Sequence, residues 1–266
     1  MKIGFIGTGN MGGALARAAA KGGHTLLLAN RTPAKAEVLA KELGGTVCPN
    51  AEAAETAELL FLGVKPQGLP GLAGELAPVL QARKGNAPVV VSMATAVMLR
   101  ELDAMLGGGL PLIRIMPNTP AAVGAGTILY AAQNVTDAQL NAFRAVLAQA
   151  GLLLPLPEAQ IDAASAISGC GPAFCFQFAD ALALGGVRAG LSYPDACRLA
   201  AQTMLGAAEM LLQGGEAPDV LKMRVCSPAG TTIEGVLALE QGGFSYTVQN
   251  AVTAAYRRTV EMTRKG

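Results

Sequence analysis

The chain has 266 residues, of which 52% are hydrophobic and only 15% charged, and its formal net charge is +1. This length allows two domains with a large core, and the near-neutral balance excludes a broad basic surface for nucleic acid. The charged fraction is low for the surface of a monomer, so we expect extensive burial between subunits.

The N-terminal residues carry a dinucleotide-binding pattern. An apolar strand is expected over residues 2–6, then Gly7-Thr8-Gly9-Asn10-Met11-Gly12, an Ala-rich helix over 11–21 and a second strand over 25–28. This strand–turn–helix–strand context makes a G-x-G-x-x-G sequence informative. Gly7 permits the tight turn, Gly9 lets the backbone approach a pyrophosphate, and Gly12 lets helix and strand pack closely. A glycine-rich turn without a ligand is the weaker interpretation.

The residues after the second strand indicate a preference for NADPH, with NADH as a second cofactor. An NAD enzyme usually places Asp or Glu here to accept from the ribose 2′-OH. This chain has Asn30-Arg31-Thr32-Pro33 instead. The Arg31 guanidinium can bind a 2′-phosphate, with Asn30 and Thr32 as further donors. A solvated Arg at a helix start is the alternative.

The inventory of histidine and cysteine excludes several classes of site. The single histidine, His24, lies in the turn before the second strand, at the edge of the sheet opposite the ligand crevice. A Ser-His-Asp triad, a catalytic His and a His-rich metal site are therefore disfavoured. The five cysteines form no C-x-x-C pair, so we expect no metal, reduced thiols and a cytoplasmic protein. Gly7 and Gly9 interrupt the first apolar run, so no signal peptide is expected.

Between residues 29 and 156 the sequence alternates between helix and strand patterns. Helices are expected over 33–43, 51–58 and 137–150, and strands over 46–48, 59–64, 88–93, 112–116 and 152–156, with an edge strand over 128–131. The alternation predicts an α/β fold with a Rossmann-type doubly wound parallel sheet. Lys65, Ser92 and Asn118 come at strand ends, where ligands bind, so we expect them to line one cleft with Gly9.

From residue 161 the strand pattern gives way to helices, expected over 161–188, 193–212, 219–224, 232–240 and 245–264. The prediction is an NADP-binding domain over 1–158 and an all-α dimerisation and substrate-binding domain over 159–266. The first of these helices is apolar nearly all round, which favours burial by a second subunit. The uncharged stretch 163–179 is too short to span a membrane and contains Gly169-Cys170-Gly171-Pro172, so no membrane partner is expected.

Near the C-terminus, Ser227-Pro228-Ala229-Gly230-Thr231-Thr232 leads from a loop into a predicted helix. Thr231 and Glu234 have the spacing of a capping box. Backbone N–H groups and the positive helix end converge near residues 230–232, which suits a carboxylate or phosphate. Alone, this pattern is usually a helix start. In a chain with a dinucleotide pattern it predicts the substrate anchor of a reductase.

Five motifs in this order resemble the pyrroline-5-carboxylate reductase family. They are F-I-G-x-G-N-M-G from residue 5, V-K-P-Q from 64, R-I-M-P-N-T-P from 114, S-G-x-G-P-A from 168 and S-P-x-G-x-T from 227. The resemblance covers nearly the whole chain. It implies reduction of 1-pyrroline-5-carboxylate to L-proline, the last step of proline biosynthesis, with NADPH or NADH. It also implies a dimer built by the helical domain, often assembled into decamers.

The resemblance also implies the site residues. The cofactor is expected to be lined by Ile6, Gly7, Thr8, Gly9, Asn10, Met11, Asn30, Arg31, Asn50, Val64, Lys65, Pro66, Met93, Ala94 and Thr95. The substrate carboxylate is expected at Ala229, Gly230, Thr231 and Thr232. Thr232 is the expected catalytic residue, hydrogen-bonded near the imine nitrogen, and Glu158 is expected near the substrate.

Two positions depart from the family pattern. The family usually has Ser-x-Ala-Ala-Gly where this chain has Ser92-Met93-Ala94-Thr95-Ala96, and we expect the added bulk to alter the affinity or pose of the nicotinamide. The family usually has Ser-Pro-Gly-Gly where Ala229 replaces the first Gly. A left-handed backbone at Ala229 therefore carries a modest cost.

The expected chemistry suits a chain with one remote histidine. A cyclic imine is basic enough to be protonated near neutrality, so hydride attack on its ring carbon needs no strong acid, and a hydroxyl such as Thr232 can orient the N–H. An alcohol substrate would need a general base. Two alternatives stay open. One is a 3-hydroxyacid dehydrogenase, in which Lys222 would be the lysine that transfers a proton, and the other is a non-catalytic NADP-binding regulator.

Overall fold

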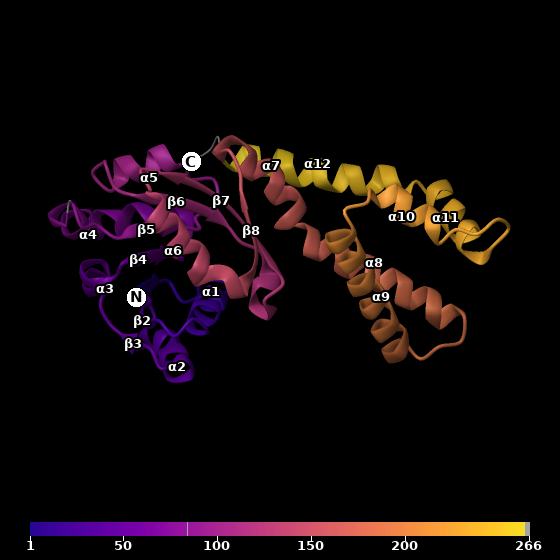
Figure 1. Cartoon of the computed structure of the whole chain (residues 1–266), viewed down its shortest axis with the longest axis horizontal. Helices are drawn as coiled ribbons and strands as arrows, with labels where there is room; N and C mark the ends of the chain where they lie inside the picture. Colours follow the sequence, from indigo (N-terminus) through magenta and orange to yellow (C-terminus); the bar gives the residue numbers. More distant parts are fainter. Residues whose placement is uncertain (84, 264–266) are drawn as a thin grey trace. The chain divides into compact units, whose positions relative to one another are not determined.

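The computed structural model describes residues 1–83 and 85–263. The chain forms two compact units (Figure 1). The first contains residues 1–169 and the end of the chain from Tyr256, and the second contains Cys170–Ala255. The helix that follows Pro157 therefore belongs to the unit that holds the sheet.

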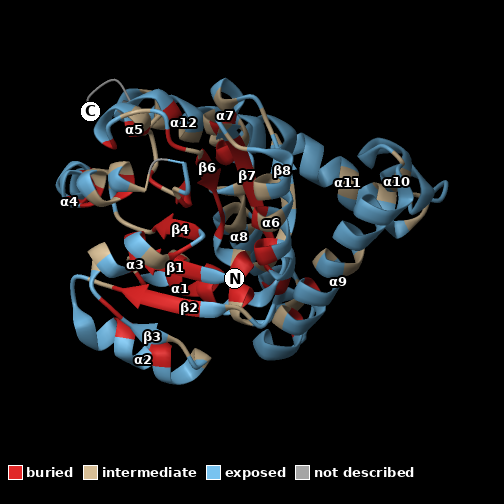
Figure 2. Cartoon of the chain, turned by 60° about the vertical axis from the view of Figure 1, so that its left-hand side comes forward, coloured by how far each residue is buried: buried red, intermediate tan, exposed pale blue. Residues whose placement is uncertain are grey.

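Within the described residues, eight strands form one sheet in the order β3-β2-β1-β4-β5-β6-β7-β8. They are β1 (Lys2–Ile6), β2 (Thr25–Ala29), β3 (Thr46–Val47), β4 (Leu59–Leu62), β5 (Val89–Ser92), β6 (Leu112–Met116), β7 (Gly126–Gln133) and β8 (Gly151–Pro155). Neighbouring strands are parallel except for β6 and β7. The predicted α/β fold is confirmed. Figure 2 shows buried residues on inner strands such as β2, β4 and β6, whereas the edge strands β3 and β8 have none.

The prediction of an edge strand over 128–131 is wrong. Strand β7 lies between β6 and β8, and Ile128, Leu129 and Tyr130 are buried. The connection from β6 to β7 contains one short 3-10 helix, η2 (Thr119–Val123), which is too short for a parallel crossover. Strand β7 therefore runs antiparallel to β6, and its other edge pairs with β8.

The helices of the first unit cover the sheet and separate its strands along the chain. They are α1 (Asn10–Ala20), α2 (Pro33–Leu43), α3 (Asn50–Thr56), α4 (Leu69–Ala82), α5 (Leu99–Met105), α6 (Asp137–Leu147) and α7 (Glu158–Ser168). The predicted elements omit α4 and α5. Helix α4 contains Pro70, Gly71, Gly74 and Pro78, which weaken a helical pattern in sequence. It forms because Leu69, Leu72, Leu76 and Leu80 are buried against the sheet.

The second unit is helical, as predicted. It contains α8 (Gly171–Arg188), α9 (Tyr193–Gly214), α10 (Pro218–Arg224), α11 (Thr231–Gln241) and the first part of α12 (Phe244–Thr263). The predicted continuous helix 161–188 is wrong, because the chain breaks at Gly169 and Cys170 and Pro172 starts a new helix in its first turn. The predicted end of the last helix at Arg264 lies outside the described residues.

The second unit buries few large apolar side chains within one copy of the chain. The buried residues of its helices are Ala183, Ala196 and Ala200, among the residues described there. In contrast, Phe176 is 71% exposed and Leu212 80%. By length and composition alone, Glu158–Arg188 is sufficient to cross a membrane, but it is divided into α7 and α8. An exposed apolar surface of this size indicates a surface that another molecule covers.

Candidate functional site

The turn between β1 and α1 has the geometry that the G-x-G-x-x-G pattern predicts. Gly7 has a φ of 98°, and a side chain there would meet the backbone of Gly63. A Cβ on Gly12 would overlap the carbonyl oxygen of Gly7, so the helix packs directly on the turn. A Cβ on Gly9 would meet no described atom within 4 Å. The turn is therefore closed toward the protein and open where a ligand would approach.

Asn30 at the end of β2 shapes this turn. Its Oδ1 accepts a hydrogen bond from the Thr8 N–H (3.1 Å), and its Nδ2 donates to the Thr32 carbonyl (3.0 Å). The Thr8 hydroxyl is buried and has no hydrogen-bond partner in the described part of the chain. A buried polar atom without a partner beside an open helix start fits an oxygen-rich ligand such as a phosphate.

A pocket of about 460 Å³ adjoins the turn. It is lined by Thr8, Gly9, Asn10, Gly13, Arg17, Ala34, Lys35, Val38 and Leu39. Arg17 is paired with both carboxylate oxygens of Glu42 at 2.6 Å, and this pair raises the pKa of Arg17 and lowers that of Glu42. Lys35 is a cation that the sequence analysis missed. Its signal is its place in the first turn of α2, where a helix favours anions.

A second pocket, of about 260 Å³, lies at the carboxyl ends of β4, β5 and β6. It is lined by Met11, Gly63, Val64, Lys65, Pro66, Met93, Thr95, Met116 and Pro117. Six of the expected cofactor residues, from three separate segments, therefore share one pocket. Six others line neither pocket. Ile6 and Ala94 are buried in the core, Asn50 donates to Glu75 Oε2 (3.0 Å), Gly7 and Asn30 belong to the turn itself, and Arg31 is exposed after β2.

The expectation that Gly9, Lys65, Ser92 and Asn118 line one cleft is wrong, because the two pockets described above bring no two of them together. Lys65 lines the smaller pocket and Gly9 the larger. Ser92 Oγ instead accepts the Ala94 N–H (3.3 Å), and Asn118 links the Ser168 carbonyl and the Thr127 N–H, at 2.8 Å each. Both side chains are buried close to where their strands end. Their hydrogen bonds therefore hold the segments around the pockets in place.

Two alanines have the left-handed backbone that the family pattern fills with glycine. Ala96 has a φ of 64° and Ala229 a φ of 56°, so the expected strain at Ala229 is present. We predict that Ala96→Gly raises the free energy of unfolding by about 0.5–1 kcal/mol, because glycine adopts this backbone freely. At this chain length the melting temperature would rise by about 1–4 °C in calorimetry at matched protein concentration.

A matched control for this substitution is Ala104→Gly, at an exposed position in α5. It should lower stability by about 0.5–1 kcal/mol, since glycine disfavours a regular helix. A loss of stability in both variants would contradict the strain at Ala96.

The predicted anchor turn leads into α11 in the second unit. The Gly230 N–H donates to the Ser227 carbonyl (3.0 Å), and a Cβ on Gly230 would overlap Ser227 Oγ. The predicted capping box is wrong, because Gly230 is the N-cap and Thr231 is already the first helical residue. The helix therefore starts one residue earlier than the capping box predicts. Thr231 and Thr232 are exposed in a first turn whose backbone N–H groups are suited to an anion.

The sequence analysis also missed a buried ion cluster around Arg114. This residue of β6 is 1% exposed, and its Nη2 donates to Asp162 Oδ1 at 2.5 Å. Its Nη1 lies 3.5 Å from Glu158 Oε1, which also accepts the Leu99 N–H at 2.7 Å. The available signal was a charged residue within the apolar strand sequence L-I-R-I-M.

Two family models match separate parts of the chain. Residues 2–96 match the model described as NADP oxidoreductase, coenzyme F420-dependent. Residues 158–262 match the model described as pyrroline-5-carboxylate reductase dimerisation. The first match contains the glycine-rich turn and the pocket residues up to Thr95. The second contains Glu158 and the turn at Ala229.

Named relatives are similar over nearly the whole chain. A pyrroline-5-carboxylate reductase of Synechocystis sp. is 39% identical and covers 100% of this chain and 99% of its own length. A solved pyrroline-5-carboxylate reductase of Coxiella burnetii is 32% identical, covers 97% of both chains and has a TM-score of 0.90. A solved Plasmodium falciparum pyrroline carboxylate reductase with NADP bound is 30% identical, covers 99% of this chain and 98% of its own, and has a TM-score of 0.86.

Proposed function

The chain belongs to the pyrroline-5-carboxylate reductase family, and we propose that it reduces the cyclic imine 1-pyrroline-5-carboxylate to L-proline with NADPH. The observation that carries the proposal is the pocket at the carboxyl ends of β4, β5 and β6, which gathers Met11, Lys65 and Thr95 from three segments. The test is the loss of nicotinamide absorbance with the imine, compared with oxidation of 3-hydroxyacids. Turnover of hydroxyacids alone would contradict the proposal.

The residues around the glycine-rich turn fit the proposed cofactor. The open face of Gly9, the orphaned Thr8 hydroxyl and the start of α1 suit its pyrophosphate. Arg31, exposed after β2, would bind the 2′-phosphate, and Lys35 adds a second positive charge on the adjoining pocket. Met93 and Thr95 would line the nicotinamide end, where the bound cofactor supplies the hydride.

The substrate would be held by the turn before α11. Backbone N–H groups near Gly230 and Thr231 would bind the carboxylate, because the positive end of the helix favours an anion. The Thr232 hydroxyl would accept the iminium N–H and orient the ring. Alignment of the two reactants supplies much of the rate acceleration, so the site needs no strong acid. Glu158 stays a predicted substrate contact, although its Oε1 is already bonded to the Leu99 N–H.

The two alternative functions have less support. A hydroxyacid dehydrogenase needs a side chain that transfers a proton. The lysine considered for this role, Lys222, lies in the last turn of α10 and precedes the anchor turn instead of forming part of it. A non-catalytic regulator would have no use for a second anion-binding turn. The full-length similarity to named reductases therefore favours the imine reductase.

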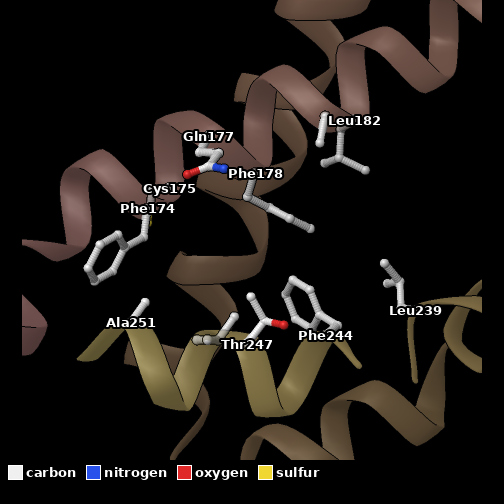
Figure 3. Close-up of a pocket in the computed structure, with 11 residues that line it drawn as sticks. Phe174, Cys175, Gln177, Phe178, Leu182, Leu239, Phe244, Thr247 and Ala251 are labelled. Carbon is white, nitrogen blue, oxygen red and sulfur yellow. The ribbon is translucent and has the colours of Figure 1, made fainter. Parts of the chain in front are cut away.

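We predict that the functional unit is a homodimer or a larger assembly of dimers such as a decamer. In the second unit, an apolar groove of about 530 Å³ separates α8 from α12, with Phe174, Phe178 and Leu182 across from Phe244 (Figure 3). Leaving such a surface in water is unfavourable, and a symmetric partner buries it in both copies. Sedimentation at micromolar concentration should show a dimer or larger species, whereas a stable, active monomer would refute the prediction.

We propose a cytoplasmic enzyme that acts on a small-molecule substrate and needs neither nucleic acid nor a membrane. Its five cysteines are free thiols in the structure, as a reducing compartment favours.

A further inference from the structure

Arg114 is a charged side chain in the middle of an apolar strand. It is 1% exposed, and its Nε has no hydrogen-bond partner among residues 1–83 and 85–263. Burial of a guanidinium is unfavourable unless it is paired, and an apolar residue of similar volume is often at least as stabilising. The charge therefore indicates a task other than holding the core together.

The partners of Arg114 lie on two different helices. Nη2 donates to Asp162 Oδ1 (2.5 Å) in α7. Nη1 lies 3.1 Å from Met98 Sδ, just before α5, and 3.5 Å from Glu158 Oε1 in the first turn of α7. The same Glu158 oxygen accepts the N–H of Leu99, the first residue of α5. Arg114 and Glu158 thus join the start of α5 to α7.

The segment 93–98 connects β5 to α5, and Arg114 reaches both of its ends. At the first end, Ser92 is paired with Arg114 in the sheet. At the second end, Met98 contacts the guanidinium and Leu99 is held by Glu158. The first end is therefore held by the pairing of β5 with β6, and the second end by the side chains of Arg114 and Glu158.

The same segment forms part of the smaller pocket. Met93 and Thr95 line that pocket, and Ala96 between them and α5 has a left-handed backbone. An alanine keeps this unfavourable backbone only where the surrounding structure over-determines it. Because both ends of the segment 93–98 are held, the backbone of Ala96 is constrained in this way.

We propose that Arg114 is a positioning residue for hydride transfer. Through Met98 and Glu158 it holds residues 93–98 in the shape that presents Met93 and Thr95 to the pocket. The proposal rests on the proposed function only for its effect on turnover. Its effect on the order of the segment is a property of the protein without any ligand. A small displacement of a residue that aligns two reactants slows the reaction more than it weakens binding.

The test uses two variants of the full chain and one control. Arg114→Lys keeps the positive charge but loses the forked guanidinium, and Glu158→Gln keeps an acceptor for Leu99 but removes the charge that faces Arg114. The control is Arg144→Lys, because Arg144 is an exposed residue of α6 whose guanidinium donates to the Tyr130 hydroxyl (2.8 Å) and not to residues 93–98. Amide hydrogen exchange of residues 93–98, without nucleotide, is the first measurement.

We expect exchange in residues 93–98 to accelerate at least about fivefold in both variants and to stay unchanged in the control. With NADPH and imine, kcat should fall at least about fivefold, and the deuterium isotope effect on kcat should increase, since the misaligned hydride step becomes slower. The dissociation constant of NADPH should stay within about twofold, because the glycine-rich turn and Arg31 hold the other end of the cofactor.

Unchanged exchange of residues 93–98 in folded Arg114→Lys would overturn the proposal. If that variant does not fold, Glu158→Gln and Met98→Leu decide in the same way. A raised KM for the imine in Glu158→Gln, with normal exchange, would also overturn it, because Glu158 would then act on the substrate without ordering residues 93–98. A wild-type protein that does not reduce the imine would refute the proposed function, while the exchange result would still decide the role of Arg114.

Discussion

Replacement of Thr232 by Ala is expected to lower kcat/KM for the imine at least about tenfold, the effect of one hydrogen bond to a charged group. The hydroxyl of Thr232 is exposed in the first turn of α11, next to the N–H groups that would bind the carboxylate. Its loss removes the group that orients the iminium N–H. The affinity for NADPH should barely change, because the residues assigned to the cofactor lie in the first unit. Steady-state kinetics and nucleotide titration measure both quantities.

Thr232→Ser is the matched control for this prediction. Serine keeps the hydroxyl and loses only a methyl group, so it should recover most of the lost kcat/KM. Normal imine kinetics in a folded Thr232→Ala protein would place the active site elsewhere and would reopen the hydroxyacid dehydrogenase alternative.

Arg31→Ala is expected to weaken NADPH binding by about 1–3 kcal/mol, which is roughly a 5- to 150-fold increase in the dissociation constant. NADH binding should change far less, because it has no 2′-phosphate to pair with the guanidinium. Arg31 is exposed directly after β2, and the amide of Asn30 is already bonded to Thr8 and Thr32. Titration of each nucleotide into the variant measures the difference.

Lys41→Ala is a suitable control for the charge alone. Lys41 lies in the last turn of α2, the helix that begins shortly after Arg31, so its removal changes the net charge equally without touching the start of that helix. Both nucleotides should bind this variant as they bind the wild type. Equal weakening of NADPH and NADH in Arg31→Ala would remove Arg31 from the 2′-phosphate site.

Elements with local start and stop signals could be predicted from the sequence. Helix α2 has the predicted bounds, because Pro33 opens it and a left-handed Gly44 ends it. The glycine-rich turn was predictable for the same reason, since each glycine answers a local steric demand. The placement of β7 inside the sheet was not predictable, because it depends on β8, which begins only at Gly151 after a helix.

Side-chain contacts between residues that are distant in sequence could not be predicted either. Arg114 meets Asp162 and Glu158 only after α7 has packed beside β6, and no spacing rule links these positions. The capping box failed for a local reason, since Gly230 is the N-cap and Thr231 is already helical. The sequence was thus sufficient to predict that residues of three segments meet in one pocket, while the contacts that support this pocket required the folded chain.

The chain leaves the first unit after Gly169 and returns to it at Tyr256. A ribosome makes the N-terminal part first, and domains generally fold as their residues emerge. Here the sheet can be assembled early, but its unit is completed only when the last helix has been synthesised. The intervening segment exposes Phe176 and Leu212 throughout that interval. Pairing of the new chain with a second copy therefore competes with aggregation. Several ribosomes on one messenger RNA would raise the local concentration of new chains and so change the rates of both processes.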